Sequence, residues 1–383
     1  MLHKIIKIIF VSLAFLSLIH NQLDIRIGNN NALAFSSNIT TKFINRPLPS
    51  TNGTHATTEL TALHPSWKYL DFQSLPLPGF KFSLVLNPIN DVAILFGGYN
   101  STIGELDDLW MTDGFEWIQF QTPHSPGGRD GASLAYDEAR QEAVLFGGYN
   151  LIALLGDTWS FNGIDWTLRN PTQSPPPRAG ASMAYDPDRN LTILFGGQGD
   201  TGGDLEPLGD MWIWDGTDWQ QQFPVHLPSA RIGANMVYDE ARHAMILFGG
   251  GAGGGLHDDT WIWDGTDWIE QQPAHRPAGR ADFGLAYDEN KQVVILYGGQ
   301  AILPYGTDTW AWDGNDWEQL QTLQTPPEAL SYNAKVVYIP ALQTVMLFND
   351  HRIKTFDPFT FTEYMEGWIL TYQYLNFLPI VVE

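Results

Sequence analysis

The chain has 383 residues, and its 20 lysines and arginines against 43 aspartates and glutamates give a formal net charge of −23. Such a charge repels phosphate backbones and argues against nucleic acid as a partner. Charged residues make up only 16% of the chain and aromatic residues 13%, the reverse of a disordered acidic protein. Cysteine is absent, which excludes disulfides, thiolate nucleophiles and cysteine-ligated metals. With 37 glycines and 24 prolines to form turns, the composition predicts a large all-β globular protein.

The amino terminus has the pattern of an export signal. Lys4 and Lys7 precede an uncharged, mostly apolar run at residues 8–19. This run suits the central region of a signal peptide and is shorter than the roughly 20 residues that span a bilayer. We expect residues 1–34 to be a signal peptide or an uncleaved anchor, and the polar residues 35–62 to be a flexible linker. The prediction is a secreted or cell-surface protein, with a cytosolic protein carrying an apolar tail as the third alternative.

A short apolar segment ending in Gly-Gly recurs about every fifty residues. It reads AILFGG, AVLFGG, TILFGG, MILFGG and VILYGG, and a sixth, degenerate copy reads VMLFND. A β-prone segment such as GASLAYD precedes it, and two tryptophans flanking an Asp-Gly or Asn-Gly turn follow it, which is a hairpin signal. Each repeat therefore predicts four short strands, named a to d in chain order. The tryptophan pairs are Trp110/Trp117, Trp159/Trp166, Trp212/Trp219, Trp261/Trp268 and Trp310/Trp317.

The Gly-Gly segment and the spaced tryptophans resemble the kelch repeat, also described as resembling the central domain of galactose oxidase, over about residues 65–357. A period near fifty is that of kelch propellers. The resemblance implies a β-propeller of four-stranded antiparallel blades around a channel, expected here over residues 63–364. Six strand-a starts and six strand-d tryptophans predict six blades. The strand-a starts are Gly79, Arg129, Arg178, Arg231, Arg280 and Ser331. The strand-d tryptophans are Trp67, Trp117, Trp166, Trp219, Trp268 and Trp317.

The two ends of the repeat region predict how the ring closes. Trp67 precedes Gly79 by the same 12 residues that separate Trp117 from Arg129. Residues 66–72 are therefore expected to form strand d of the last blade, so that an amino-terminal strand closes the ring and removes exposed sheet edges. Residues 359–364 are a competing strand d. The tail, residues 365–383, is β-prone and has no assigned place.

One connection of the repeat varies in length. The first glycine lies 13, 12, 16, 12 and 12 residues before the strand-c tryptophan. By contrast, the strand-a tyrosine position always lies 11 residues before that glycine, and the two tryptophans are always 7 residues apart. Because strands in a blade alternate in direction, the b–c and d–a connections share one face. Variable loops on a rigid scaffold often bind ligands, although they can also be merely tolerant of change. The candidate binding residues on this face are Tyr99, Asn100, Tyr149, Gln198, Asp200, His257, Gln300 and Tyr305.

Four blades begin strand a with an arginine, and these residues have two interpretations. As a ring at the channel mouth, Arg129, Arg178, Arg231 and Arg280 could bind carboxylates or phosphates. The favoured alternative is that they brace the blades by pairing with an aspartate that recurs two residues before each strand-c tryptophan. These aspartates are Asp108, Asp157, Asp210, Asp259 and Asp308.

The repeated tryptophans and glycines are interpreted as structural. A tryptophan at one position of every blade is expected in the core between blades rather than on a sugar-stacking surface. The Gly-Gly pairs lack the strand-to-helix context of a phosphate loop, so we expect them where the backbone needs positive φ.

No catalytic signature stands out in the sequence. Without cysteine, the copper and Tyr–Cys radical cofactor of galactose oxidase relatives cannot form, and no histidines have metal-ligand spacing, so no cofactor or metal is expected. The first hypothesis is an exported, monomeric module that binds a protein or glycan through the b–c and d–a face and meets a membrane only through an uncleaved amino-terminal segment. The alternative is a carbohydrate-active enzyme whose site, at the channel mouth, has unpaired arginines. A scaffold with no ligand is the third possibility.

Overall fold

The structure is a computed structural model that describes residues 63–70, 76, 80–301, 306–323, 325–326, 334–354 and 361–374. The expected signal peptide or anchor (residues 1–34) lies outside the described residues, and so does the linker up to residue 62. Tyr305, Ser331, the first residues of the competing strand d and residues 375–383 also lie outside them.

The described residues form six four-stranded antiparallel sheets, here called blades 1 to 6. In blades 1 to 5 the strands follow one another along the chain as strands a, b, c and d. Blade 1 holds β2 (Ser83–Asn87), β3 (Val92–Phe96), β6 (Leu109–Thr112) and β7 (Trp117–Phe120). Blade 2 holds β8 (Ser133–Asp137), β9 (Glu142–Phe146), β12 (Thr158–Phe161) and β13 (Trp166–Arg169).

The next three blades repeat this order. Blade 3 holds β15 (Ser182–Asp186), β16 (Leu191–Phe195), β19 (Met211–Trp214) and β20 (Trp219–Gln222). Blade 4 holds β21 (Asn235–Asp239), β22 (Ala244–Phe248), β25 (Thr260–Trp263) and β26 (Trp268–Glu270). Blade 5 holds β28 (Gly284–Asp288), β29 (Val293–Tyr297), β31 (Thr309–Trp312) and β32 (Trp317–Leu320).

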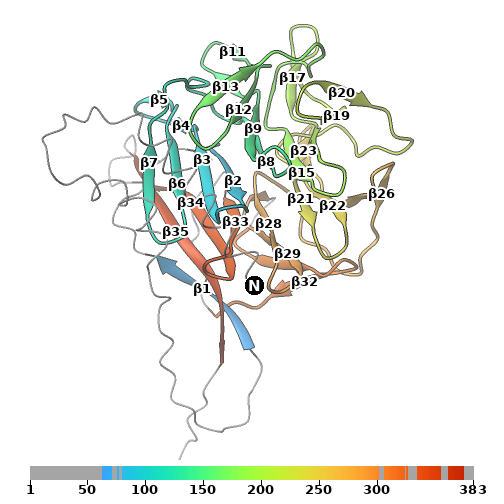
Figure 1. Ribbon diagram of the computed structural model, residues 1–383. Helices are drawn as coiled ribbons and strands as arrows, with labels where there is room; N and C mark the ends of the chain where they lie inside the picture. Colours follow the sequence, from blue (N-terminus) through green and yellow to red (C-terminus); the bar gives the residue numbers. More distant parts are fainter. Residues whose placement is uncertain are drawn as a thin grey trace, which may run out of the picture. The chain divides into compact units, whose positions relative to one another are not determined.

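Blade 6 is built from both ends of the repeat region. It holds β33 (Lys335–Ile339), β34 (Thr344–Lys354), β35 (Phe361–Tyr374) and β1 (Leu63–Leu70), and β1 pairs with β35 from Leu63↔Tyr374 to Leu70↔Gly367. Blue β1 lies beside red β35 in Figure 1. The amino-terminal strand thus takes the strand-d position, as predicted.

The propeller extends further along the chain than the sequence predicts. The boundary at residue 364 is wrong, because β35 runs to Tyr374 and takes in residues 365–374 of the unassigned tail. Residues 361–364 pair with β34 and so belong to strand c, not to a competing strand d. The repeat pattern could not locate this strand because the sixth copy has Asn349-Asp350 in place of Gly-Gly, and β34 continues through these residues to Lys354.

The strand-a positions line the centre of the propeller. Each of β2, β8, β15, β21, β28 and β33 contacts the next, and β33 contacts β2 (Figure 1). The hydrophobic clusters lie between neighbouring blades. One joins blades 6 and 1 through Phe348 and Trp117, whose ring centroids are 4.8 Å apart. Strand a is therefore the innermost strand, and the blades pack through apolar sheet faces.

The strand-d tryptophans are core residues, as predicted. All six are at most 2% exposed. The indole of Trp219 donates a hydrogen bond to the Thr158 hydroxyl of the preceding blade, and Trp317 donates in the same way to Thr260. Trp67 repeats this contact with Thr309 at 2.8 Å. The amino-terminal strand therefore packs against blade 5 as other strands d pack against the blade before them.

The Gly-Gly pairs do need positive φ. Gly97 and Gly98 have φ of 68° and 106°. A Cβ atom on Gly97 would lie 2.6 Å from the main-chain oxygen of Arg129 in the next blade, and the Gly98 N–H donates to that same oxygen. The pair therefore lets one blade approach the backbone of the next.

Candidate functional site

The b–c connections form small hairpins on the face that also carries the d–a connections, here called the loop face. Their bases are bonded to the residues that precede strand a of the same blade, as in the β14–β17 pairing, and their tips project. The hairpin strands are β4 (Tyr99–Asn100) and β5 (Gly104–Glu105), β10 (Tyr149–Asn150) and β11 (Ala153–Leu154), β17 (Gln198–Asp200) and β18 (Leu205–Pro207), and β23 (Gly251–Ala252) and β24 (Gly255–Leu256). In blade 5, β30 (Gln300–Ala301) pairs with β27 (Arg280–Ala281), as β14 (Arg178–Ala179) pairs with β17 in blade 3.

The aromatic and amide candidates are anchored to different degrees. Tyr99 and Tyr149 are half-buried, and the Tyr99 ring lies 5.1 Å from that of Phe80. Asn100 is buried, and its side-chain oxygen accepts the N–H groups of the two residues that turn the hairpin. It is therefore a turn-forming residue. Gln300 is exposed on β30.

The remaining candidates also differ in what they offer a ligand. Asp200 is exposed, but its carboxylate accepts the N–H groups of Gly202 and Gly203, which lowers its pKa. Gln198 is half-buried and reaches the wall of the central channel. Burial, followed by the charge of Arg231, lowers the pKa of His257. Asp200 therefore shapes its own hairpin, whereas Gln198 and His257 lie deeper than the tips.

The four strand-a arginines are not available on the loop face. The guanidinium of Arg178 makes two bonds to the Asp210 carboxylate, at 2.6 and 2.8 Å, and its side chain is 0% exposed. Its backbone bonds to the b–c connection of the preceding blade. The pairs Arg129–Asp157, Arg231–Asp259 and Arg280–Asp308 repeat this geometry. The arginines are therefore braces and not a ligand-binding ring, because their charge is already buried and paired with aspartates.

The paired aspartates have pKa values below their ordinary range. Burial alone would raise the pKa of Asp210, but the hydrogen bonds and charge of Arg178, with a bond from the Trp212 indole, outweigh it. Asp157, Asp259 and Asp308 behave in the same way. Each pair therefore holds a permanent carboxylate beneath a hairpin, poorly suited to act as a general base.

Sequence reasoning missed an apolar patch at the hairpin tips. Ile103, Leu151 and Ile152 are 61%, 66% and 89% exposed, and we call them the tip patch. The Leu151 N–H donates to the Glu105 carboxylate at 2.8 Å, so the tips of blades 1 and 2 touch. Leu205 on blade 3 is also exposed. The signal was present in the sequence, because the b–c connection of blade 2 reads LIALL between polar residues.

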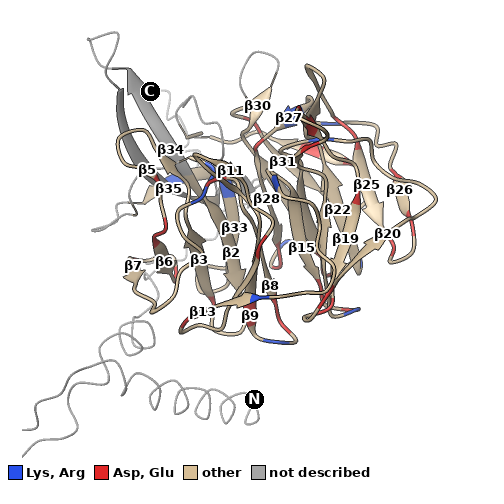
Figure 2. Cartoon of the chain, turned by 90° about the horizontal axis from the view of Figure 1, so that it is seen from above, with Lys and Arg blue, Asp and Glu red and all other residues tan. Residues whose placement is uncertain are grey.

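Acidic residues outnumber basic residues among the exposed side chains of the b–c connections. The five b–c connections, residues 99–108, 149–157, 198–210, 251–259 and 300–308, contain no lysine or arginine. Besides the strand-a arginines, the d–a connections of blades 1 to 4 contain three charged residues, Asp130, Arg276 and Asp282. Red acidic segments outnumber blue basic ones along the ribbon in Figure 2. The exposed acids of the b–c connections are Asp107, Asp200, Asp204, Glu206 and Asp258.

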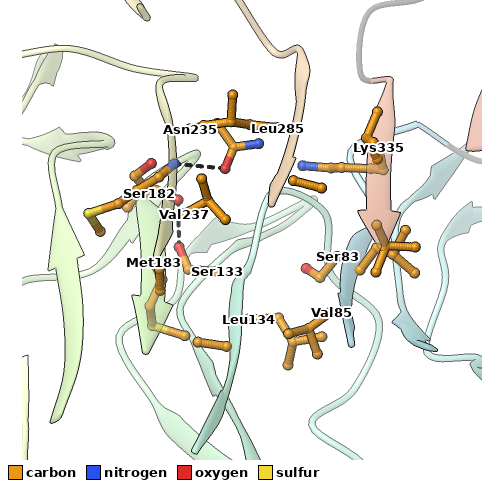
Figure 3. Close-up of a pocket in the computed structure, with 18 of the residues that line it drawn as sticks. Ser83, Val85, Ser133, Leu134, Ser182, Met183, Asn235, Val237, Leu285 and Lys335 are labelled. Atoms are coloured by element: carbon orange, nitrogen blue, oxygen red, sulfur yellow. Dashed lines mark hydrogen bonds between the residues drawn. The ribbon is translucent and has the colours of Figure 1, made fainter. Parts of the chain in front are cut away.

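A cavity of about 330 Å³ lies along the central channel, lined by the six innermost strands (Figure 3). Among the residues that the structure describes, no group of three or more histidines, aspartates or glutamates is placed to hold a metal ion. The same residues include no helix long and apolar enough to cross a membrane.

Comparison with known families agrees with this architecture. The family model of the KLHDC2/KLHL20/DRC7 Kelch-repeats domain matches the chain twice, over residues 54–220 and 164–348. The two matches overlap and together cover well over half of the chain. Kelch repeats generally mediate protein binding. No curated protein matches the chain.

Proposed function

We propose, since the chain belongs to the kelch-repeat family, that it binds a protein ligand through its loop face. The observation that carries the proposal is the tip patch, three large aliphatic side chains held in water by hairpins anchored on a rigid ring. Contiguous exposed apolar side chains mark interaction sites, and interfaces centre on such anchors surrounded by polar groups. A glycan would instead need exposed aromatic faces. Among the b–c hairpins Tyr99 and Tyr149 are half-buried, and the exposed Phe223 lies apart from the tip patch on the d–a connection after blade 3.

The charge around the tip patch describes the ligand further. The b–c connections carry exposed acidic residues and contain no lysine or arginine. They therefore favour a ligand segment that combines basic residues with an apolar anchor. Complementary charge raises the association rate and makes it fall with added salt. The protein carries out this role as a monomer, outside the cell or at its surface. That location rests on Lys4, Lys7 and the apolar run at residues 8–19.

The enzyme alternative receives no support from the described residues. It required unpaired arginines at the channel mouth, and Arg129, Arg178, Arg231 and Arg280 are all paired with aspartates. A binding role therefore remains the proposal.

A matched pair of triple variants tests this proposal. The test variant changes Ile103, Leu151 and Ile152 to serine, and the control changes Ile89, Leu168 and Ile269, which are also exposed but lie off the loop face. Both variants should fold like the wild type, since substitutions at exposed sites shift the unfolding free energy by about 0.5 kcal/mol or less each.

The two variants should differ in binding. Proteins captured by the immobilised wild type and by the control should be lost with the test variant, a fall in affinity of about tenfold or more. Their capture should also weaken with added salt. Equal capture by both variants would remove the tip patch as the site. Binding of the wild type to a glycan array, without protein capture, would favour the glycan hypothesis instead.

A further inference from the structure

The channel mouth on the loop face is narrowed by a chain of main-chain hydrogen bonds between blades. The N–H of Gly131 donates to the oxygen of Lys81, Gly180 donates to Gly131, Gly233 to Gly180, and Asp282 to Gly233, at 2.8 to 3.0 Å. All five residues have positive φ, between 56° and 66°. We call them the mouth residues. They occupy one repeat position in blades 1 to 5.

Two mouth residues are charged where the backbone favours glycine. Lys81 and Asp282 hold φ of 59° and 56°, a conformation that strains any residue with a Cβ atom and that glycine adopts freely. Such strain gathers at functional sites. The mouth therefore has a glycine half, with Gly131 and Gly180, and a charged half, and the Asp282 carboxylate lies over Gly233.

Lys335 adds a second cation just inside the charged half. Its side chain extends from β33 into the channel, which it helps to line (Figure 3). At the same repeat position Ser83, Ser133 and Ser182 each donate to a main-chain oxygen of the next blade. The Lys335 side chain at this position makes no such hydrogen bond, and no ion pair, with any of the described residues.

Lys335 and Asp282 affect each other's pKa without forming an ion pair. Burial lowers the pKa of Lys335, and the charge of Asp282 opposes this effect. Burial raises the pKa of Asp282, and the charges of Lys335 and Lys81 oppose it. No ion pair within 4.0 Å joins Lys335 to Asp282. The mouth therefore holds a half-buried amine and a half-buried carboxyl group from neighbouring blades, which line the same cavity and are not paired with each other, so a ligand that carries both charges can complement them.

We propose that the channel mouth binds a small zwitterion of the amino-acid class, with its carboxylate on Lys335 and its ammonium on Asp282. Gly131 and Gly180, which carry no side chains of their own, line the cavity that would take the body of such a ligand. The cavity of about 330 Å³ lies at the small end of ligand pockets, which run from about 300 to 1,000 Å³. A zwitterion satisfies both charges without adding net charge to the channel. This site is separate from the tip patch and goes beyond the proposed protein binding.

Thermal unfolding of the full chain with simple probes tests the proposal. The probes are glycine, β-alanine, γ-aminobutyrate and ε-aminocaproate, which differ in the spacing of their charges, with acetate and methylammonium as single-charge controls. A ligand that binds only the folded state raises Tm in proportion to its occupancy. At least one zwitterion should raise Tm in a saturable way and by more than either single-charge probe at equal concentration. If no zwitterion does so, or if acetate alone matches it, the proposal is overturned.

Variants separate binding from folding. Asp282→Gly removes the carboxylate and supplies the residue that the backbone favours, so without probe its Tm should equal or exceed that of the wild type. Its zwitterion shift should vanish. Lys335→Met should also lose the shift, whereas Lys68→Met, at an exposed lysine on β1, should keep it. A shift retained in Asp282→Gly would refute the site. The tip-patch variant should keep the shift, so failure of one proposal is distinguishable from failure of the other.

Discussion

Arginines stabilise the connections on both faces of the propeller, but they are buried on one face and partly exposed on the other. On the loop face, Arg178 and its equivalents are buried and paired beneath hairpins of variable length. On the face of the a–b and c–d turns, Arg189 is 34% exposed, pairs with Asp186 and reaches the next blade, where it donates to the Asp264 oxygen at 2.6 Å. Arg140 and Arg242 pair in the same way with Asp137 and Asp239.

The position of these arginines explains which connections tolerate sequence change. On the turn face the arginine lies directly over the glycine of the neighbouring turn, as Arg189 lies over Gly265, so turn length and composition are constrained together. On the loop face the brace lies below the hairpin, and the tip makes few contacts of its own. Hairpins can therefore vary in length while the pairs beneath them keep the blades in place.

Breaking a loop-face brace should have the largest effect. Arg178→Met leaves the Asp210 carboxylate without its partner, and removing one member of a buried pair lowers the unfolding free energy by about 3–5 kcal/mol. Denaturant unfolding measures it. The matched control, Arg276→Met, removes an arginine of the same face whose nearest carboxylate, Asp258, is 4.0 Å away, and it should cost about 1 kcal/mol or less. Similar losses in the two variants would contradict the brace.

The second-largest effect should come from acid, which removes the contribution of the paired aspartates to the unfolding free energy. The paired aspartates have folded pKa values below their ordinary value of 3.8, so their contribution is present above that value and is lost as the pH falls through the folded pKa. We expect the unfolding free energy to fall below about pH 4. The double variant Arg178→Met/Asp210→Leu, which removes one whole pair, should show a shallower pH dependence. An unchanged slope would mean that these pairs do not govern acid unfolding.

Breaking a turn-face contact should have the smallest effect. Arg189→Met removes one bond to the next blade and one ion pair, but Asp186 still accepts the N–H groups of its own turn. Because the arginine is partly solvated, we expect a loss of about 1–2 kcal/mol. Measured beside Arg178→Met under the same conditions, a loss as large as that of the buried pair would erase the distinction between the faces.

Several features of the site were predictable from the repeats and others were not. The recurrence of an aspartate before each strand-c tryptophan predicted the partners of the four arginines, because a repeated acid and a repeated base fold into the same relative positions. Asn100 was assigned to the binding face because its position in the loop is visible, whereas its bonds to its own hairpin are not. The end of blade 6 was misjudged because β34 and β35 lack the glycine and tryptophan landmarks.

The repeats in the sequence were enough to predict the number of blades, the buried tryptophans and the positive φ of the Gly-Gly pairs. Each of these depends on local periodicity, and five copies of one pattern reinforce one another. The sequence does not reveal that Lys335 and Asp282 line the same channel, or that the tips of blades 1 and 2 touch through Leu151 and Glu105, because both facts depend on how the blades pack. These residues belong to different repeats, and their proximity arises from the packing of neighbouring blades around the channel, which no pattern within a single repeat encodes.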